Sequence, residues 1–483
     1  MPNKTTLNEK LELLIDGVWR QGSTGVTEDV INPATEEVIG ILPHASTEDM
    51  DEALDAAEKA FIEWRNTSAW KRGDILKEAA KILRDRADHV AELLTLEQGK
   101  TLPESKGEVI RSVETIEWFA EEGKRAYGRI IPGRDNHSRN MMVTEPVGVV
   151  LSLTPWNFPI ITPVRKMAAA LAAGCTVIAK PSEETPATGI ALARAFTDAG
   201  LPAGALNVVF GVPDTVSRHF IDSGRIRKLS FTGSIPVGKH LAALAAQHMI
   251  RCTFELGGHS PVLVFEDADV EDAAKQLAGF KFRNAGQVCI SPTRFYVQDS
   301  VHDQFSKIFI DYAKSLNVGN GMDKDVQMGP LANSRRLDAM DEFVQDARDH
   351  GATIATGGKR MGNKGYFYEP TVMTEVPEEA RIMNDEPFGP LAPIVRFSNI
   401  DDVIEQANRL PYGLASYSFT GSSKTAARVA DALETGMVGI NSVNVSLPET
   451  PFGGVKESGY GHECAIEGLE VYLNHKFITQ VGT

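Results

Sequence analysis

One short stretch of the sequence contains a side chain that can act as a nucleophile, the thiol of Cys289. It follows a loop-like segment at Gly286 and precedes a strand-like run at 294–297, and loops held by rigid scaffolds often carry catalytic groups. A thiolate is the strongest nucleophile among the side chains at neutral pH, provided that a neighbouring group helps to form it. A lone cysteine is more often a small buried apolar residue, so the case for Cys289 depends on the rest of the chain.

Two other residues carry groups that a thiol nucleophile uses. Glu255 ends a strand-like run (251–254) and precedes two glycines, so its carboxylate can face a cleft and act as a general base. Asn157 stands where a helical pattern starts, and its side-chain amide can donate to an oxyanion. The simpler interpretations are an exposed glutamate without a partner and an ordinary helix cap.

Lys180 and Glu183 directly follow a buried strand-like run at 176–179. In a parallel sheet, ligands bind beyond the carboxyl ends of the strands. A carboxylate there can accept both ribose hydroxyls of an adenosine, and the lysine can reach the same ribose. The alternative is a solvated pair at a helix start, with Glu183 favourable to the helix dipole.

A strand, a turn at Gly233 and a helix start follow one another between 231 and 238. Ser234 could cap this helix, and the backbone donors there would suit a pyrophosphate. With Lys239 the segment also nearly matches the phosphate loop GxxxxGK[ST] of ATPases. His240, however, stands where that loop needs a hydroxyl to bind magnesium, so a phosphate-loop ATPase is kept only as an alternative.

Length and composition limit the class of protein. A chain of 483 residues exceeds one ordinary hydrophobic core, so two or three domains are expected. A hydrophobic content of 42% and a charged content of 24% are typical of a soluble globular protein. The net charge of −16 argues against nucleic acid or an anionic membrane as a partner. Neither a metal site nor a disulfide framework is expected, because the four cysteines show no CxxC spacing.

The sequence contains no segment that would direct the chain to a membrane. Residues 1–10 are polar and lack the apolar core of a secretion signal. No apolar run reaches the length of about 18 residues that a membrane span needs. We therefore expect a cytoplasmic protein.

The elements that position these residues follow from the hydrophobic patterns. Residues 12–45 predict two hairpins and 47–127 predict helices, whose alanine-rich stripe we interpret as core packing. From 147 to 255, buried strand-like runs alternate with helical patterns, which indicates a parallel, doubly wound sheet. A second alternating region, 262–440, predicts a second α/β domain that carries Cys289. The tail, 471–481, is interpreted as an isolated strand.

Seven short motifs occur in an order that identifies a family. In this order the sequence resembles the aldehyde dehydrogenase superfamily over nearly its whole length. The motifs are PWNFP at 155–159, KPSE at 180–183, FTGS at 231–234, ELGG at 255–258, GQVC at 286–289, EPFGP at 386–390 and PFGG at 451–454.

The resemblance implies an α/β fold with two doubly wound domains, a Rossmann-like cofactor domain and a catalytic thiol domain, plus a small β element for oligomerisation. It also suggests a homodimer or a homotetramer. The expected parts are the NAD(P)-binding domain at 1–128 and 147–255, the catalytic domain at 256–440, oligomerisation strands at 129–146 and 467–483, and a segment at 441–466 that returns to the cofactor domain.

By resemblance, Cys289 is the nucleophile that adds to an aldehyde carbon, and the amide of Asn157 and the Cys289 backbone N–H hold the oxyanion. Glu255 would activate the water that hydrolyses the resulting thioester, and could also deprotonate the thiol. Relatives that transfer the acyl group to coenzyme A generally lack a carboxylate at the ELGG position, so Glu255 favours water as the acceptor. A catalytically silent binding protein is the alternative, and the intact Asn157, Glu255 and Cys289 argue against it.

The resemblance implies NAD as the cofactor, with NADP as an alternative. Glu183 would accept ribose hydroxyls and repel a 2′-phosphate, whereas Ser182 beside Lys180 could accommodate one. The residues expected to bind the cofactor are Trp156, Lys180, Ser182, Glu183, Gly233, Ser234, Gly257, Glu386 and Phe388.

Within the superfamily, the chain looks most like succinate-semialdehyde dehydrogenases. The matching residues for the substrate carboxylate are Arg165, Arg283 and Ser446, and guanidinium forks suit a planar carboxylate. A surface or interdomain salt bridge is the alternative for each arginine. Ser291 stands where some members carry a second cysteine, so a redox switch is not expected.

The chain resembles α-ketoglutaric-semialdehyde dehydrogenases almost as well, notably in HSPV at 259–262 and CISPTRF at 289–295. That substrate has the same aldehyde and distal carboxylate on a longer chain that carries an added keto group. The partner expected from both resemblances is therefore a small semialdehyde with a distal carboxylate.

Overall fold

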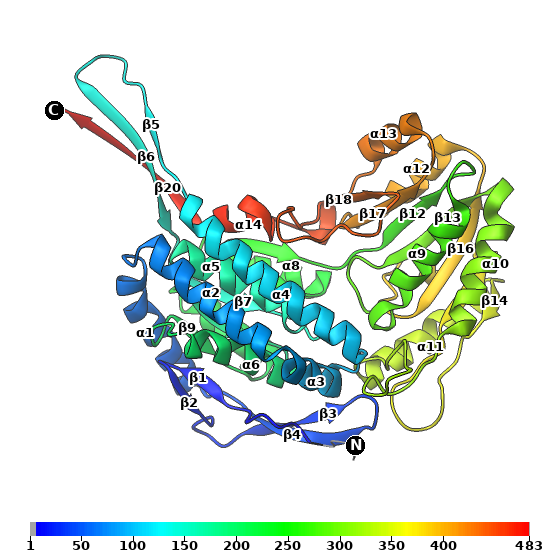
Figure 1. Ribbon diagram of the computed structural model, residues 1–483, viewed down its shortest axis with the longest axis horizontal. Helices are drawn as coiled ribbons and strands as arrows, with labels where there is room; N and C mark the ends of the chain where they lie inside the picture. Colours follow the sequence, from blue (N-terminus) through cyan, green and yellow to red (C-terminus); the bar gives the residue numbers. More distant parts are fainter. Residues whose placement is uncertain (1–5, 483) are drawn as a thin grey trace.

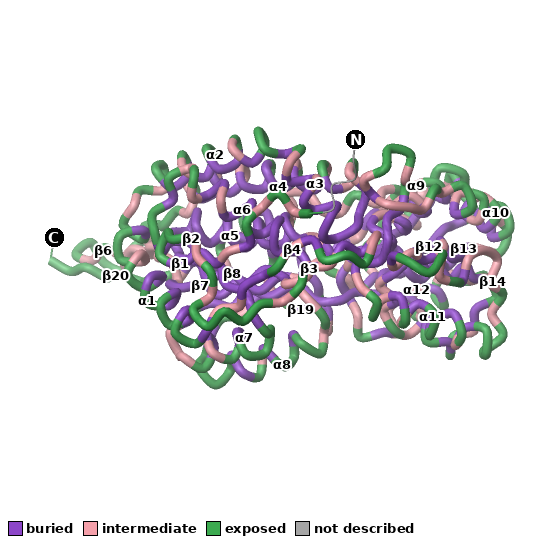
Figure 2. Tube along the Cα trace, turned by 90° about the horizontal axis from the view of Figure 1, so that it is seen from below, coloured by how far each residue is buried: buried purple, intermediate pink, exposed green. Residues whose placement is uncertain are grey.

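The computed structural model describes residues 6–482; Met1–Thr5 and Thr483, which belong to the predicted cofactor-binding and oligomerisation segments, lie outside the described residues. Two large sheets lie next to each other, and a three-stranded arm projects from the first (Figure 1). Figure 2 shows the buried strands β7 and β8 in a middle layer, with α2 and α5 on one side and α7 and α8 on the other. One hydrophobic core surrounds the first sheet and another surrounds the second. The predicted α/β class is confirmed.

The first sheet has eight strands in the order β19-β11-β10-β7-β8-β9-β1-β2. Its centre is parallel, as predicted, because a helix connects each central strand to the next and returns the chain to the same edge. The central strands are β7 (Val149–Leu153), β8 (Thr176–Lys180), β9 (Leu206–Val208), β10 (Lys228–Thr232) and β11 (Arg251–Glu255). The connecting helices are α5 (Ile161–Ala173), α6 (Pro186–Asp198), α7 (Pro213–Asp222) and α8 (Ile235–Ala246).

Antiparallel strands complete both edges of this sheet, so it is mixed at its margins. At one edge, β1 (Leu13–Ile15) pairs with β9 and forms a hairpin with β2 (Val18–Arg20). Asp16 and Gly17 connect the hairpin with φ angles of 46° and 78°, the left-handed turn that an Asp-Gly pair predicts. At the other edge, β19 (Gly459–Tyr460) pairs with β11.

The second sheet has seven strands in the order β14-β15-β16-β13-β12-β17-β18 and is parallel except at β14. Two of its strands, β15 and β18, are short apolar runs that the sequence patterns did not reveal. The strands are β12 (Ser260–Val264), β13 (Pro292–Gln298), β14 (Thr353–Thr356), β15 (Thr371–Thr374), β16 (Leu391–Phe397), β17 (Ala415–Phe419) and β18 (Met437–Ile440). The helices around them are α9 (Val270–Phe282), η2 (Arg283–Gly286), α10 (Asp299–Ser315), α11 (Ser334–Asp349), η3 (Arg381–Met383), α12 (Ile400–Asn408) and α13 (Ser423–Ala432).

The amino-terminal helices pack on the first sheet, and their alanine stripe is buried as predicted: Ala53 and Ala57 are fully buried. A capping box starts α1, where Ser46 and Asp49 exchange hydrogen bonds between side chain and backbone. The elements before the first parallel strand are β3 (Thr27–Asn32), β4 (Glu37–Pro43), α1 (Thr47–Trp64), α2 (Ala69–Asp85), α3 (Ala87–Gln98), α4 (Leu102–Glu122) and η1 (Gly123–Arg125).

The arm consists of β5 (Arg129–Ile131), β6 (Ser138–Pro146) and β20 (Leu473–Val481). The tail is not an isolated strand: β20 pairs antiparallel with β6 along all nine of its residues, and β6 lies within the 129–146 ribbon, the other predicted oligomerisation segment. The predicted strand segment 467–483 also starts too early, since its first residues lie in α14 (Ala465–Glu470). Ile130 and Phe477 are 76% and 62% exposed on the arm, which supports its proposed role in oligomerisation.

The segment 441–466 contributes η4 (Lys456–Ser458) and β19, which joins the first sheet. This path supports our proposed domain division, in which the chain leaves the cofactor domain near 255 and returns to it after 440. Within residues 6–482, no helix combines the length and the apolar character that crossing a membrane requires.

Candidate active site

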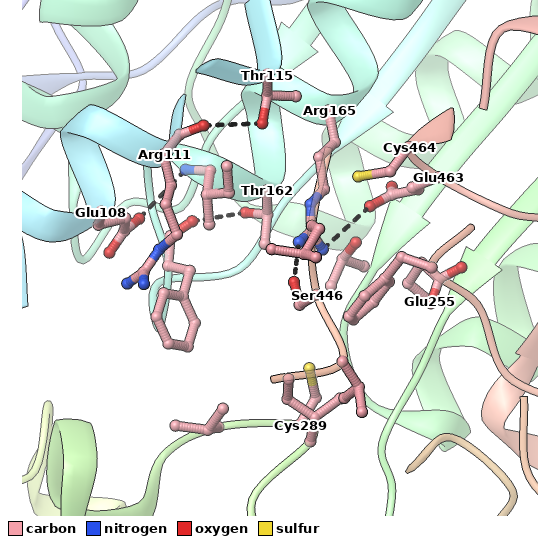
Figure 3. Close-up of a pocket in the computed structure, with 18 of the residues that line it drawn as sticks. Glu108, Arg111, Thr115, Thr162, Arg165, Glu255, Cys289, Ser446, Glu463 and Cys464 are labelled. Carbon is pink, nitrogen blue, oxygen red and sulfur yellow. Dashed lines mark hydrogen bonds and ion pairs between the residues drawn. The ribbon is translucent and has the colours of Figure 1, made fainter. Parts of the chain in front are cut away.

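One cavity, here called the thiol cavity, brings together six of the residues that the sequence singled out, four of which Figure 3 labels. It encloses about 890 Å³, its open mouth included. Its walls come from α4, α5, the loop before β13 and the segment after β18, so residues far apart in the sequence meet here. The six residues are Asn157, Arg165, Glu255, Arg283, Cys289 and Ser446.

The loop that carries Cys289 has an unusual backbone. Asn284, Ala285 and Gly286 have φ angles of 49°, 52° and 73°, so three consecutive residues adopt the left-handed conformation after α9 ends. This conformation costs free energy for residues other than glycine, and such strain concentrates at functional sites. At Gly286 a Cβ would overlap the carbonyl oxygen of Gly389, so the loop also needs glycine there to approach the 386–390 segment.

Side-chain hydrogen bonds hold this loop in place. Asn284 Nδ2 donates to the Asn157 carbonyl at 3.0 Å, and Gln287 Oε1 accepts from the Ala332 N–H at 2.9 Å. On the other side of the cysteine, the Tyr417 hydroxyl donates to the Ile290 carbonyl at 2.6 Å. The thiol therefore sits on a segment whose position both sheets determine.

Cys289 is half-buried, and its surroundings favour the neutral thiol. Burial, followed by the charge of Glu386, raises the pKa of Cys289 to about 12. The Arg165 guanidinium and the Ile290 backbone N–H act on this pKa in the opposite direction. The thiol therefore needs a proton acceptor when it attacks, and the thiolate that forms has two stabilising neighbours.

Glu255 ends β11 and is 2% exposed. Both of its carboxylate oxygens lack a hydrogen-bond partner in the part of the chain that the structure describes, although they line the cavity. Burial, then the neighbouring Glu463, raises the pKa of Glu255 well above its usual range, while Lys166 and Arg165 oppose this shift. A carboxylate with a raised pKa and free oxygens is equipped to take a proton from water or from a thiol.

Asn157 follows β7 and is 4% exposed. Its Nδ2 donates to the Gln287 carbonyl at 3.2 Å, which holds the amide against the nucleophile loop. An amide nitrogen has two hydrogens, so one N–H remains for a further acceptor. The Asn157 backbone carbonyl accepts a hydrogen bond from Lys100 Nζ at 2.8 Å, which holds the backbone of Asn157 in place.

Arg165 lies on α5 and is 8% exposed. Its Nη2 donates to Ser446 Oγ at 2.6 Å, so two of the residues predicted to hold the substrate carboxylate contact each other. Its guanidinium also stacks 4.2 Å from the centre of the Phe452 ring. Its Nη1 lies 4.0 Å from Glu463 Oε2, so Arg165 also forms a long ion pair, as the alternative interpretation predicted.

Arg283 behaves differently. Its guanidinium lies over the rings of Phe280 and Phe158, at 4.7 Å and 5.5 Å from their centres. Within residues 6–482, no carboxylate lies within 4.0 Å of it, so the salt-bridge interpretation does not apply to Arg283. Its charge is held at the cavity wall by two aromatic faces.

Several residues of the thiol cavity were missed in the sequence. Glu108, Arg111 and Thr115 line it from α4, at spacings of three and four that place them on one helix face (Figure 3). This polar stripe could have been detected, but it lay within a helical region interpreted only as core packing. Cys464 also lines the cavity, with a φ of 62°, and no local pattern marked it or the adjacent Glu463.

A second cavity, here called the strand-end cavity, lies beyond the carboxyl ends of β7, β8 and β10 and encloses about 1540 Å³ with its open mouth. Arg335 of α11 contributes to its wall, so this cavity also borders the second sheet. Six of the predicted cofactor residues line it, namely Trp156, Lys180, Ser182, Glu183, Gly233 and Ser234.

Charged and polar groups at this cavity suit a dinucleotide. Lys180 and Glu183 form an ion pair at the end of β8, so the lysine charge is already balanced. Ser234 occupies the N-cap of α8 without a side-chain hydrogen bond to the helix. The first-turn backbone donors of α8 have no acceptor within the helix and can bind a phosphate, except at Pro236, which has no N–H.

The phosphate-loop alternative finds no support at this turn. Lys239 Nζ pairs with Glu457 Oε1 at 2.6 Å, so it is engaged outside the turn. His240 Nε2 lies 3.2 Å from Asp214 Oδ1 and supplies no hydroxyl for magnesium.

The other three predicted cofactor residues, Gly257, Glu386 and Phe388, line neither cavity. Gly257 and Glu386 contact each other, and Phe388 contacts Trp156 of the strand-end cavity. Glu386 Oε1 accepts from the Gly258 N–H at 3.2 Å, and a Cβ on Gly257 would overlap the Glu386 carboxylate. Burial raises the pKa of Glu386 to about 7, and the Gly258 N–H opposes this shift. The Phe388 ring meets the Trp156 ring edge to face, with centres 5.7 Å apart.

Comparison with known proteins agrees with this arrangement. The model of the aldehyde dehydrogenase family matches residues 19–478. A putative 4-(hydroxymethyl)benzenesulfonate dehydrogenase of Comamonas testosteroni is 44% identical, covering 99% of this chain and 100% of its own. The succinate-semialdehyde dehydrogenase [NADP(+)] of Escherichia coli is 41% identical and covers 97% of both chains. The crystal structure of betaine aldehyde dehydrogenase from Staphylococcus aureus in complex with NAD+ has a TM-score of 0.96 and 36% identity, covering 98% of this chain and 95% of that one. The chain belongs to the aldehyde dehydrogenase family.

Proposed function

We propose that this protein oxidises an aldehyde that carries a distal carboxylate, with succinate semialdehyde to succinate as the reaction that the site fits best, and with NAD or NADP as the oxidant. The observation that carries the proposal is one cavity in which Cys289 and Glu255 lie together with Arg165 and Ser446. The first pair can form and hydrolyse a thioester, and the second pair can hold an anion. A phosphate-loop nucleotidase and a silent binding protein lack comparable support.

In the first step, Cys289 Sγ forms a bond to the aldehyde carbon while its proton passes to a base. The carbonyl π electrons move to oxygen, and this oxyanion accepts from the free N–H of Asn157 and from the Cys289 backbone N–H. One such donor contributes about 3 kcal/mol to lowering the barrier. The cofactor, when bound, supplies the acceptor for the hydride that leaves the former aldehyde carbon. The acyl group then remains on sulfur as a thioester.

In the second step, Glu255 takes a proton from a water molecule as the water oxygen attacks the thioester carbon. The carbon–sulfur bond breaks, the carboxylic acid forms, and the thiolate of Cys289 leaves. Transfer of the proton from Glu255 to this thiolate restores both groups to their starting states. Glu255 suits this step because its oxygens line the cavity without protein hydrogen bonds and because its raised pKa makes the ionised carboxylate a stronger proton acceptor. It could serve the thiol in the first step in the same way.

The strand-end cavity is the proposed cofactor site, and its residues fit a dinucleotide. Glu183 would accept the adenosine ribose hydroxyls, and the first turn of α8 beyond Ser234 would bind the pyrophosphate. Glu386 and Phe388 would hold the nicotinamide end beside Trp156. Because Glu183 balances Lys180, we propose NAD as the preferred cofactor and NADP as the alternative.

Replacing Glu183 with Gln should shift the cofactor preference toward NADP by about tenfold in kcat/KM, the size of one charge interaction. The substitution removes repulsion of a 2′-phosphate and frees Lys180 to bind it. Steady-state rates with both cofactors measure the ratio, and Glu117→Gln, at an exposed pair with Arg84, serves as the control. An unchanged ratio would remove Glu183 from cofactor discrimination.

The distal carboxylate is the feature of the substrate that the cavity explains. Arg165, Arg283 and Ser446 present guanidinium and hydroxyl donors on its wall. The named substrates of the two relatives above, a semialdehyde acid and a benzenesulfonate alcohol, both carry a distal anion. α-Ketoglutaric semialdehyde remains the alternative substrate, since it presents the same two end groups.

Replacing Arg283 with Ala should raise the KM for succinate semialdehyde at least about tenfold and change the KM for butanal by less than about twofold. Only succinate semialdehyde has a carboxylate that the Arg283 guanidinium could bind. Initial rates with both aldehydes at saturating cofactor measure this. An equal rise for both substrates would mean that Arg283 supports the cavity wall through Phe158 and Phe280 instead of binding substrate.

We also propose a homodimer or homotetramer held together by the arm. The apolar side chains exposed on β5 and β20 support this, since an exposed apolar strand surface is usually covered by a partner.

A further inference from the structure

Arg111 is a charged residue of the thiol cavity to which the proposed mechanism gives no role. It lies on α4, one turn after Glu108 and one turn before Thr115, and all three line the cavity. Thr115 and Glu108 are buried, whereas Arg111 is exposed. Arg111 therefore stands at the mouth of the cavity, with its guanidinium directed away from the helix (Figure 3).

Arg111 and Arg283 line the cavity without a direct ion-pair partner in the described part of the chain. Within residues 6–482, neither guanidinium has a carboxylate within 4.0 Å. The nearest acid on the same helix face, Glu108, is already engaged: its Oε2 accepts from Lys100 Nζ at 2.6 Å and its Oε1 from the Ile160 N–H at 3.0 Å. The cavity mouth thus carries positive charge that an anion from solution can neutralise.

Glu104, the other nearby acid, is occupied as well. Its Oε1 accepts from the Asn284 N–H at 2.8 Å and its Oε2 from the Thr101 N–H at 3.0 Å. Burial lowers the pKa of Arg283, and the like charge of Arg111 lowers it further. Glu104 has a smaller effect in the opposite direction. The two arginines are therefore close enough to repel each other, and a shared anion would relieve this repulsion.

Arg165 differs from this pair in depth and in charge balance. It is 8% exposed, donates to Ser446 and lies 4.0 Å from Glu463. In Figure 3, Arg165 lies between Arg111 and Glu255. Arg165 is thus buried and has an acid within ion-pair distance, whereas Arg111 and Arg283 are more exposed and have none.

We propose that Arg111 and Arg283 form an outer anion subsite, which binds the distal carboxylate of aldehyde acids longer than succinate semialdehyde. This inference rests on the proposed function, because the aldehyde end must still reach Cys289. In this proposal, a four-carbon chain places its carboxylate among Arg165, Ser446 and Arg283, so that Arg283 serves both the shorter and the longer substrates. A six-carbon ω-oxo acid extends further toward the mouth, where two guanidinium forks can hold its carboxylate.

The test compares Arg111→Gln with the unmodified protein on three substrates: succinate semialdehyde, 6-oxohexanoate and hexanal. The variant should raise the KM for 6-oxohexanoate about tenfold, the loss expected for one charge-assisted hydrogen bond. The KM for succinate semialdehyde and for hexanal should stay within about twofold. Arg111→Lys should recover part of the loss for 6-oxohexanoate, because it restores the charge without the fork.

Arg84→Gln is the matched control: Arg84 is an exposed arginine of α2, paired with Glu117 and outside both cavities, and its loss should leave all three KM values unchanged. Equal KM values for 6-oxohexanoate in Arg111→Gln and the unmodified protein would overturn the outer subsite. So would failure of the unmodified protein to oxidise 6-oxohexanoate while it oxidises succinate semialdehyde. In both cases the proposed function stands, whereas inactivity of the unmodified protein on all three aldehydes would overturn the two together.

Discussion

Cys289→Ala should lower the rate of NAD(P)H formation by roughly four to six orders of magnitude, the loss that follows removal of a covalent nucleophile. No other thiol can take over. Cys175 and Cys252 do not line the thiol cavity, and Cys464 lies on a different wall of it, in a segment after β18. Because Cys289 is half-buried on the surface of the cavity, a methyl group there should change the packing little.

The measurement is the absorbance of the reduced cofactor with succinate semialdehyde, together with mass spectrometry of protein quenched during turnover. The unmodified protein should carry an acyl group on the peptide that contains Cys289, and Cys289→Ala should carry none. Cys252→Ala, a half-buried thiol outside the cavity, should retain full activity. Near-normal turnover by Cys289→Ala would refute the covalent mechanism.

Glu255→Gln should slow the second half of the reaction by about 10²- to 10⁴-fold, the contribution of a general base. If Glu255 serves only the hydrolysis step, the thioester still forms. Rapid mixing should then show a burst of reduced cofactor of about one per active site, followed by slow steady-state turnover. Loss of the burst would show that Glu255 also accepts the thiol proton, and an unchanged steady-state rate would remove it from catalysis.

The pH dependence gives an independent check on the same residue. The pKa of Glu255 is raised, so at low pH the carboxyl group is protonated and cannot act as a base. Activity should therefore increase as pH rises through this pKa, and Glu255→Gln should lack that increase. Glu122→Gln, at a buried carboxylate of α4 outside both cavities, should retain the wild-type profile. A profile of the same shape in Glu255→Gln would assign the ionisation to another group.

The sequence predicted well whatever depends on short-range patterns. The hairpin that turns at Asp16 and the parallel strands that lead to Lys180 and Thr232 formed as expected. Buried parallel strands are continuous apolar runs and their following helices are periodic, so both can be recognised locally. The family prediction is also confirmed. It could be made from the sequence because the family motifs are short segments around strand ends.

The sequence patterns failed where pairing or contact crosses long distances along the chain. The pattern of β20 predicts a strand but not its register, because its hydrogen-bond partner β6 lies more than 300 residues earlier in the chain. Four-residue strands such as β15 and β18 are too short for periodicity to separate them from loops. The role of Arg111 on α4 could not be predicted from its helix alone, because only the folded chain brings it into the same cavity as Arg283.

The amino-acid sequence by itself determined the fold class, the family and the identity of the thiol, the carboxylate and the amide at the proposed reaction centre, because each lies in a segment whose local pattern is distinctive. Only the tertiary structure decided which charges remain available to a substrate. Arg165 lies 4.0 Å from Glu463, a residue almost 300 positions away, whereas the Arg283 guanidinium lies over two aromatic rings with no acid within ion-pair distance in the described residues. Charge balance depends on distance in space and on burial, and neither quantity can be obtained from the order of residues along the chain.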